Sequence, residues 1–263
     1  MANIVNGLGQ TKVGVRVASG GGGGGAIDTD AQAFITAAAI TDTTQQGAIN
    51  TLVTQLKTDG IWSKMKALYP FVGGTAESHR WNLKNTSQYK IDWFGGGTHT
   101  SIGYVPNGLS FGSTYLSNDT LPQNSCHISI YATGTNFSGG CDIGSYQGSW
   151  GTMIYSRQTY FETTVNSNSI VYPGYTTRKG FNLTSRTTSN SIFSQFNQSQ
   201  TTYNTTSTTP KTSFFHISKP GGWNGDYSTR QLGLVSIGDG LTNGEAILFY
   251  NAVLAYQTTL SRQ

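Results

Sequence analysis

The side chains that could support catalysis in this chain are few and scattered. Only three glutamates occur among its 263 residues, at Glu77, Glu162 and Glu245. Hydrolysis of a glycosidic bond needs two carboxyl groups about 5 to 9.5 Å apart, on one strand or on facing strands. Glu162 has no acidic neighbour two or four residues away, and Asp142 is the one partner that can be nominated for it. We therefore expect a protein that is not an enzyme, with a polysaccharide hydrolase as an alternative.

The histidines and cysteines do not have the spacing of metal ligands. The four histidines stand apart from one another, and Cys126 and Cys141 are the only cysteines. Two such cysteines form neither a zinc site nor a disulfide framework, and unbonded cysteine is commonly buried. The glycine run from Gly20 to Gly25 lacks the Lys-Ser/Thr that follows it in a phosphate-binding loop. We expect no metal, no cofactor and two free, packed thiols.

Two tryptophans stand in loop-like stretches that are rich in glycine and asparagine. Trp150 lies in one of them, and Trp223 lies in the other beside Asn224 and Asp226. Sugar-binding sites combine an apolar aromatic surface with a few hydrogen-bonding groups. An exposed tryptophan there would indicate a binding role, whereas a buried one would indicate packing. Glycan binding through these four residues is therefore a hypothesis, and core packing is its alternative.

The composition suits a β-sandwich with many turns. Charged residues make up only 11% of the chain, and 34 residues are glycine. After residue 72, short strand-like runs alternate with turns rich in Gly, Pro and Asn. The clearest runs are residues 127–131, 152–155, 169–172, 191–193 and 213–217. We predict a mainly β protein with a jelly-roll sandwich, in which the Thr-rich residues 198–210 form a long hairpin tip.

Residues 26–72 have helical periodicity instead. Asp28, or the threonine after it, is placed to cap a first short helix, and Asp42 is placed to cap a second. Gly60 is expected to end the second helix. The apolar residues within 61–69 predict a further helical apolar face after it.

The C-terminal residues predict a helix that lies on the strands. Thr242 and Glu245 have the spacing of a capping box, in which each side chain covers a free backbone N–H of the first turn. Apolar residues then recur at steps of three and four, at Ala246, Phe249, Val253, Tyr256 and Leu260. We expect this stripe to pack on the sandwich.

The first 25 residues predict an arm joined to the body by a tether. Val13, Val15 and Val17 alternate with Lys12 and Arg16, so an extended strand would carry the valines on one side. The glycine run after the arm is a flexible linker. We predict that the arm adds a strand to the sheet of a partner. The alternative is a disordered tail.

The charge pattern argues against two kinds of partner. The net charge is +4, but no run of basic residues occurs, so nucleic-acid binding is not indicated. No apolar stretch reaches the roughly 18 residues that span a bilayer, and no charged segment precedes an apolar core at the N-terminus. We expect neither membrane insertion nor a secretory signal.

Two segments resemble a group of virion proteins of tailed phages. The first runs from Ala33 to Lys84 and includes the sequence Gly-Ile-Trp-Ser-Lys-Met-Lys-Ala-Leu-Tyr-Pro-Phe-Val-Gly-Gly. The second runs from Ile237 to Gln263 and begins Ile-Gly-Asp-Gly-Leu-Thr. Similar segments bracket a concanavalin A-like (LamG-type) jelly roll in head-fibre and tail-fibre proteins, particularly those of crAss-like phages. The resemblance covers residues 28–263, and it implies this fold, a place on the virion and no shared catalytic motif.

These expectations describe a phage virion structural protein, either a head fibre or a capsid decoration. Residues 1–25 would be the anchoring arm, 26–72 a helical segment and 73–263 the jelly-roll domain with its C-terminal helix. The arm would bind capsid or other virion proteins, and the body would be exposed on the particle surface. Because fibres commonly close by symmetry, we predict a homotrimer with the helical segment between protomers. The alternative is a tail-fibre adhesin that binds host-surface glycans.

Overall fold

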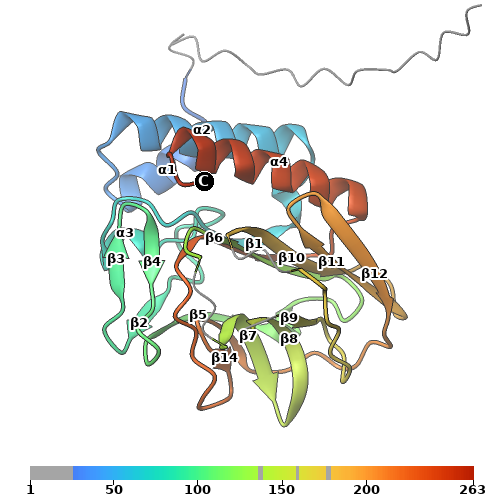
Figure 1. Ribbon diagram of the computed structural model, residues 1–263. Helices are drawn as coiled ribbons and strands as arrows, with labels where there is room; N and C mark the ends of the chain where they lie inside the picture. Colours follow the sequence, from blue (N-terminus) through green and yellow to red (C-terminus); the bar gives the residue numbers. More distant parts are fainter. Residues whose placement is uncertain (1–25, 136–138, 158–159, 176–178) are drawn as a thin grey trace, which may run out of the picture.

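The chain folds into three layers, formed by two β-sheets and a set of helices. The computed structural model describes residues 26–135, 139–157, 160–175 and 179–263. In Figure 1, helices α1 (Thr29–Ala37), α2 (Thr43–Thr58) and α4 (Asn243–Thr259) cover one sheet, and the second sheet lies beyond it. Three single-turn elements complete the helices: η1 (Trp62–Lys64), α3 (Ala76–His79) and η2 (Asn118–Thr120). The predicted mainly β sandwich is confirmed.

Sheet A lies in the middle of the molecule, and its strand pairs are antiparallel. In spatial order its strands are β12 (Ser199–Asn204), β11 (Ser191–Phe196), β10 (Gly180–Arg186), β6 (Cys126–Ala132), β15 (Leu232–Gly238), β4 (Gly103–Val105) and β3 (Thr98–Thr100). The short strand β1 (Met65–Tyr69) also pairs with β15. Segments far apart in the sequence therefore lie side by side at the centre of the sheet.

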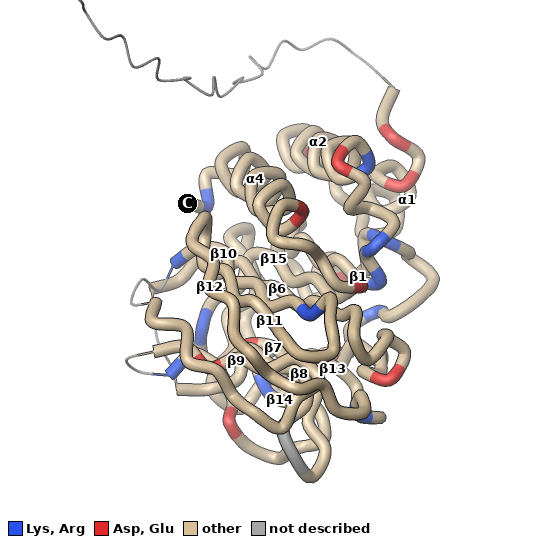
Figure 2. Tube along the Cα trace, turned by 90° about the vertical axis from the view of Figure 1, so that its right-hand side faces the viewer, with Lys and Arg blue, Asp and Glu red and all other residues tan. Residues whose placement is uncertain are grey.

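Sheet B forms the outer layer on the side away from the helices. In spatial order its strands are β2 (Asp92–Phe94), β5 (Phe111–Ser117), β13 (Phe214–Ile217), β7 (Cys141–Gln147), β8 (Ser149–Ser156) and β9 (Phe161–Thr164). The two-residue strand β14 (Pro220–Gly221) runs parallel to β7. Figure 2 shows the same layers from the side, with few charged residues along the chain.

The helices begin where the predicted caps lie. The Asp28 side chain accepts a hydrogen bond from the backbone N–H of Asp30 at 2.9 Å and caps α1. Asp42 accepts one from the N–H of Gln45 at 2.8 Å and caps α2. Thr242 and its partner three residues later form the predicted capping box of α4. These caps satisfy N–H groups that have no partner within the helix, so each fixes where its helix starts.

Two hydrophobic cores lie on the two faces of sheet A, one under the helices and one between the sheets. The side chains of β6 point alternately to the two faces of the sheet. Because a core covers each face, the strand is buried along its whole length. Ile128 and Ile130 face the core between the sheets, whereas Tyr131 faces the core under the helices. Phe249 of α4 meets Phe181 of β10 in that second core, with ring centroids 5.4 Å apart. The predicted stripe of the C-terminal helix therefore packs on sheet A.

The apolar stripe of α2 is covered within the same chain. Ala48, Ile49, Leu52, Val53 and Leu56 are all buried in the core under the helices. These side chains are therefore not available to the contact between protomers that we expected from this segment.

Three local predictions were wrong. Residues 61–69 form η1 and then β1, because Met65–Tyr69 pairs with β15 along its backbone and its side chains alternate between the two cores. Residues 198–210 contain the edge strand β12 instead of a hairpin tip, since its polar side chains face solvent while its backbone pairs with β11. Residues 169–172 contribute only the single bridge between Val171 and Thr163. Both cysteines are free and buried, as predicted.

Candidate functional site

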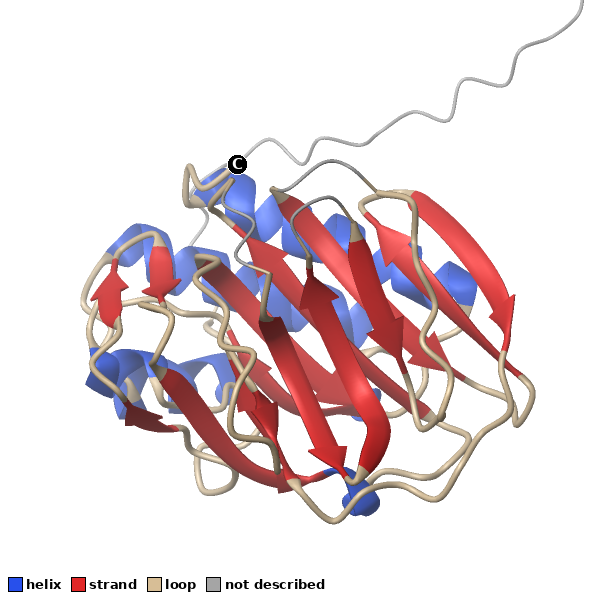
Figure 3. Cartoon of the chain, turned by 60° about the horizontal axis from the view of Figure 1, so that its bottom comes forward, coloured by secondary structure: helices blue, strands red, loops and turns tan. Residues whose placement is uncertain are grey.

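The outer face of sheet B is the broad face that the helices do not cover. In Figure 3, sheet B lies in front and the helices lie behind the strands. Asp92 of β2 pairs with Ser113 of β5, which in turn pairs with His216 of β13. The adjacent row contains Trp93 and Ile217, which pack in or against the core between the sheets. The row of Asp92 therefore points outwards.

Five ring-bearing residues gather on this outer face, and we call them the aromatic face: Phe94, Phe111, Tyr115, Phe214 and His216. Phe111 stacks on Phe94 at a centroid distance of 4.8 Å and on His216 at 4.9 Å. Tyr115 and Phe214 meet edge to face at 5.5 Å. Phe94, Tyr115 and Phe214 are 44%, 46% and 42% exposed. The strands thus present an apolar ring surface to solvent.

A pocket of about 400 Å³ adjoins the aromatic face. Its lining residues are Ala76, Glu77, Arg80, Ile91, Asp92, Trp93 and Phe94. The Asp92 carboxylate accepts hydrogen bonds from Arg80 Nη2 at 2.8 Å and from Tyr115 Oη at 2.9 Å. The hydrogen bond to Asp92 raises the pKa of the Tyr115 hydroxyl. A fixed carboxylate and a fixed guanidinium therefore stand beside the exposed rings.

A lysine lies over the ring stack on the same face. Lys219 Nζ is 4.4 Å from the centroid of Phe111 and 5.3 Å from that of Tyr227. Burial lowers the pKa of Lys219. Burial, and to a smaller extent the Lys219 charge, lowers the pKa of His216 to about 4. The His216 ring is consequently neutral at neutral pH.

The predicted glycan-binding residues lie partly beside this face. Trp223 is 48% exposed and its ring meets that of Tyr146 at 5.4 Å. Asn224 Oδ1 accepts a 3.4 Å hydrogen bond from the hydroxyl of Tyr227, whose ring lies 6.3 Å from Phe111. The segment after β14 thus places Tyr227 beside Phe111, while Trp223 contacts Tyr146 of β7.

The remaining two predicted residues have different surroundings. Asp226 Oδ2 accepts a 3.1 Å hydrogen bond from the hydroxyl of Tyr155. Trp150 lies in β8 next to the turn at Gly148 instead of in a loop, and its side chain lies outside the described part of the structure.

The two acids nominated for hydrolysis are held by arginines. Asp142 Oδ2 lies 2.9 Å from Arg230 Nη1, and both side chains are fully buried. Glu162 Oε2 accepts a 2.9 Å hydrogen bond from Arg157 Nε and is almost fully buried. Each carboxylate has a counter-charge, and Asp142 has no exposure through which it could reach a substrate.

The described residues offer no other arrangement typical of catalysis or metal binding. Ser110 lies in the sequence Gly-Leu-Ser-Phe-Gly, which matches a nucleophile pattern, but it precedes a strand, whereas that pattern requires a strand-to-helix turn. Its hydroxyl is buried and bonds to Tyr104 Oη at 3.0 Å. No three His, Cys, Asp or Glu side chains of the described segments group closely enough to hold a metal. Within the same segments, no helix is both long and apolar enough to cross a membrane.

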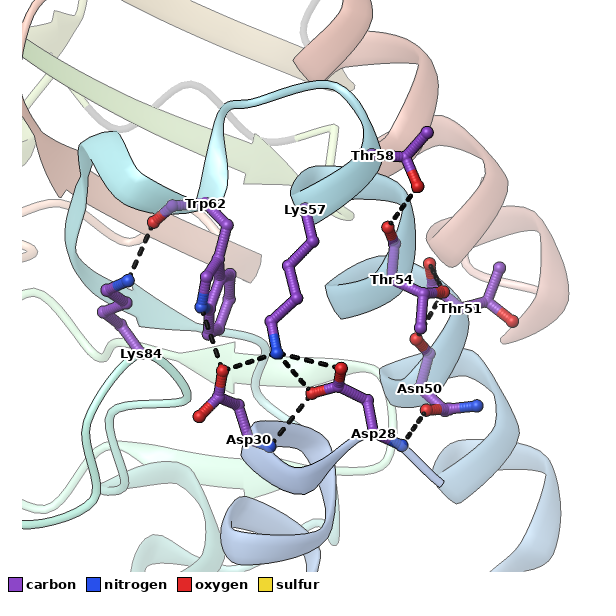
Figure 4. A network of polar contacts seen from close by, with 9 residues as sticks. All are labelled: Asp28, Asp30, Asn50, Thr51, Thr54, Lys57, Thr58, Trp62 and Lys84. Atoms are coloured by element: carbon purple, nitrogen blue, oxygen red, sulfur yellow. Dashed lines mark hydrogen bonds and ion pairs between the residues drawn. The ribbon is translucent and has the colours of Figure 1, made fainter. Parts of the chain in front are cut away.

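A network of polar contacts fixes the chain where α1 begins (Figure 4). Lys57 Nζ lies 2.7 Å from carboxylate oxygens of both Asp28 and Asp30. Trp62 Nε1 donates to Asp30 Oδ2 at 3.1 Å, and Lys84 lies over the Trp62 ring at 4.6 Å. The hydrogen bond from Lys57 lowers the pKa of Asp28. The predicted anchoring residues Lys12, Val13, Val15, Arg16 and Val17 lie outside the described residues.

The two sheets, which pack face to face on a shared core, define a β-sandwich of the jelly-roll type. No family model and no curated protein sequence matches the chain. The structure is similar to domain 4 of an extracellular arabinanase from Geobacillus stearothermophilus, solved in complex with arabinotriose. The two share 12% identity and a TM-score of 0.52, over 71% of this chain and 98% of that domain.

The structure is also similar to a mutant of Trypanosoma rangeli sialidase that displays trans-sialidase activity. The identity is 9% and the TM-score 0.52, over 80% of this chain but only 39% of the sialidase. At such identities the likeness establishes the sandwich fold alone. Neither similarity bears on the phage origin, which stays a prediction.

The aromatic face was not among the sites predicted from sequence. Its signal is present in β5, where Phe111 and Tyr115 alternate with Gly112 and Leu116, and in β13, where Phe214 precedes a buried Phe215. Rings at outward positions of both strands, Phe111 and Tyr115 in β5 and Phe214 and His216 in β13, would have indicated such a surface.

Proposed function

We propose that this protein is a non-enzymatic, virion-displayed binding domain that holds glycans on the aromatic face of sheet B. The observation that carries the proposal is the set of half-exposed rings beside a pocket that contains fixed charges. A 400 Å³ pocket falls within the range of small-molecule sites.

The residues of the face match what a sugar offers. The apolar C–H side of a sugar ring can lie on the half-exposed ring of Phe94, which Phe111 supports from the next strand. Sugar hydroxyls can donate to the Asp92 carboxylate and accept from the Arg80 guanidinium, which are already oriented by each other. Little side-chain freedom would be lost on binding, because these groups are held before the ligand arrives.

Display on a particle is the second part of the proposal. The first described residues, before α1, lie in the helical layer, on the opposite side of sheet A from sheet B (Figure 1). An arm that leaves from this layer would hold the body by one side and leave the aromatic face free. The arm would use Val13, Val15 and Val17 to add a strand to a capsid or tail protein. A homotrimer remains our expectation for the displayed state.

A glycan array with three proteins tests the binding function. The wild type is expected to bind a defined set of glycans, and Phe111→Ala is expected to bind them at least tenfold more weakly because aromatic anchors dominate binding energy. Leu248→Ala is the matched control, since Leu248 is an exposed apolar residue on α4, in the helical layer. Absence of binding by the wild type, or equal loss in both variants, would refute the proposal.

Deletion of residues 1–19 tests the display function. The shortened protein should fold and bind glycans as the full chain does, but it should no longer copurify with particles. Normal incorporation into particles would contradict the anchoring role of the arm.

A further inference from the structure

We propose that the Lys219 end of the aromatic face is a subsite for the carboxylate of an acidic sugar. This inference rests on the proposed glycan-binding function and specifies the class of sugar that the face selects.

Lys219 is an unusual lysine among the described residues. Its side chain is mostly covered, with the residue 8% exposed, and its Nζ lies over two rings. No ion pair or hydrogen bond of Lys219 occurs within the described segments, whereas Lys57, Lys64 and Lys66 each have a carboxylate partner. Lysines are rarely buried unless they are paired. The charge of Lys219 is thus poorly solvated and has no counter-charge.

Three acids of sheet B and of the segment after β14 already have partners. Asp226 accepts from Tyr155, Glu162 is bound by Arg157, and Asp142 is bound by Arg230. The Lys219 ammonium has no partner within the described segments, but it is not fully enclosed, so solvent reaches it. An external anion is therefore the group that can complete its interactions.

His216 contacts the same ring, Phe111, that lies under Lys219. Its Nδ1 is enclosed and has no hydrogen-bond partner in the described structure. Stacking on Phe111 holds the ring in place. A ligand carboxylate can therefore reach the Lys219 ammonium but not this enclosed nitrogen.

The rings beside Lys219 explain why the anion would be part of a sugar and not a small free ion. Lys219 lies over Phe111, and Phe111 stacks on the exposed ring of Phe94, so a ligand that binds the ammonium lies next to an apolar ring surface. A pyranose with a carboxyl group presents both an apolar ring face and the anion.

Binding of matched acidic and neutral polymers tests this subsite. The probes are polygalacturonate and polysialic acid, each compared with the same polymer after reduction of its carboxyl groups. We expect the wild type to prefer the acidic form of at least one pair by about tenfold to hundredfold, as a hydrogen bond to a charged group provides. Lys219→Met should abolish this preference, so that the acidic and the reduced polymers bind equally well, while the methionine still covers Phe111.

Two further variants separate the possible outcomes. Phe111→Ala should weaken both forms of the polymer, and Lys90→Met, which removes a lysine stacked on Trp81 instead, should weaken neither. An acidic preference that survives Lys219→Met, or a wild type that binds neutral glycans alone, would overturn the subsite and leave the glycan-binding function standing. A wild type that binds nothing on the array would overturn both. Thermal unfolding of each variant shows whether its fold is retained.

Discussion

Replacing Asp142 with asparagine would leave the Arg230 guanidinium buried without its counter-charge. The two side chains are fully buried, and Asp142 Oδ2 lies 2.9 Å from Arg230 Nη1. Asp142 also accepts a 2.8 Å hydrogen bond from Ser228 Oγ and a further one from Ser156 Oγ. The guanidinium lies over Phe161 at 4.9 Å. The described side chains that bond to the Asp142 carboxylate, Ser156, Ser228 and Arg230, all donate to it.

The expected loss follows from this burial. Removing one partner of a buried ion pair costs about 3–5 kcal/mol, because the remaining charge stays out of water without compensation. Asp142→Asn and Arg230→Met should each lower the free energy of unfolding by that amount. The double variant should lose much less than the sum, since no uncompensated charge remains.

Urea unfolding of the wild type, both single variants and the double variant measures this coupling. Glu77→Gln is the control, because its ion pair with Arg80 is exposed and is expected to contribute less than about 1 kcal/mol. An Asp142→Asn protein that unfolds at the same urea concentration as the wild type would refute the structural role. If the same protein had also lost a polysaccharide-cleaving activity, the hydrolase alternative would be supported instead.

Three further perturbations test the helical layer and its core. Phe249→Ala should cost about 3–5 kcal/mol in chemical unfolding, since the ring is fully buried, and a loss below about 1 kcal/mol would contradict that packing. His127 is buried and has a pKa lowered to about 4, chiefly by burial, so the folded state keeps it neutral while the unfolded chain takes up a proton below its ordinary value of 6.5. The free energy of unfolding is therefore unaffected by this residue above pH 6.5, and it falls by up to about 3 kcal/mol as the pH drops to 4. His127→Gln should flatten this part of the pH profile, measured by thermal unfolding. Thr242→Ala should lower stability by about 1 kcal/mol and Thr242→Ser should restore most of it, and equal stabilities of the three proteins would argue against the cap.

The helix caps could be predicted from sequence because each is a local event. Asp42 and Thr242 bond to N–H groups three residues away, so the residue types at that spacing are sufficient to place the start of a helix. The prediction of a helical face in residues 61–69 was wrong because their apolar spacing fits a helix and a strand equally well. Pairing of β1 with β15, far away in the sequence, decided the outcome.

The candidate site could be predicted less well than the helices, because strand pairing brings its residues together. Phe111 and His216 stack because β5 pairs with β13, and no spacing within either segment indicates this register. Trp223 is exposed, as a binding residue requires, whereas the aromatic face combines phenylalanines, a tyrosine and a histidine that strand register brings together.

The outer faces of the two sheets differ in a way that favours one of them as the binding face. On sheet A, Tyr131, Phe181 and Leu183 point outwards, and the helices bury them. On sheet B, Phe94 and Phe214 occupy outward positions and remain about half exposed. Full burial of such a side chain is worth about 1.5–3 kcal/mol, so the fold forgoes stabilisation that a covering element would provide. A ligand that stacks on these rings gains that burial on binding, and therefore we expect glycans on sheet B and the particle on the side of the helices.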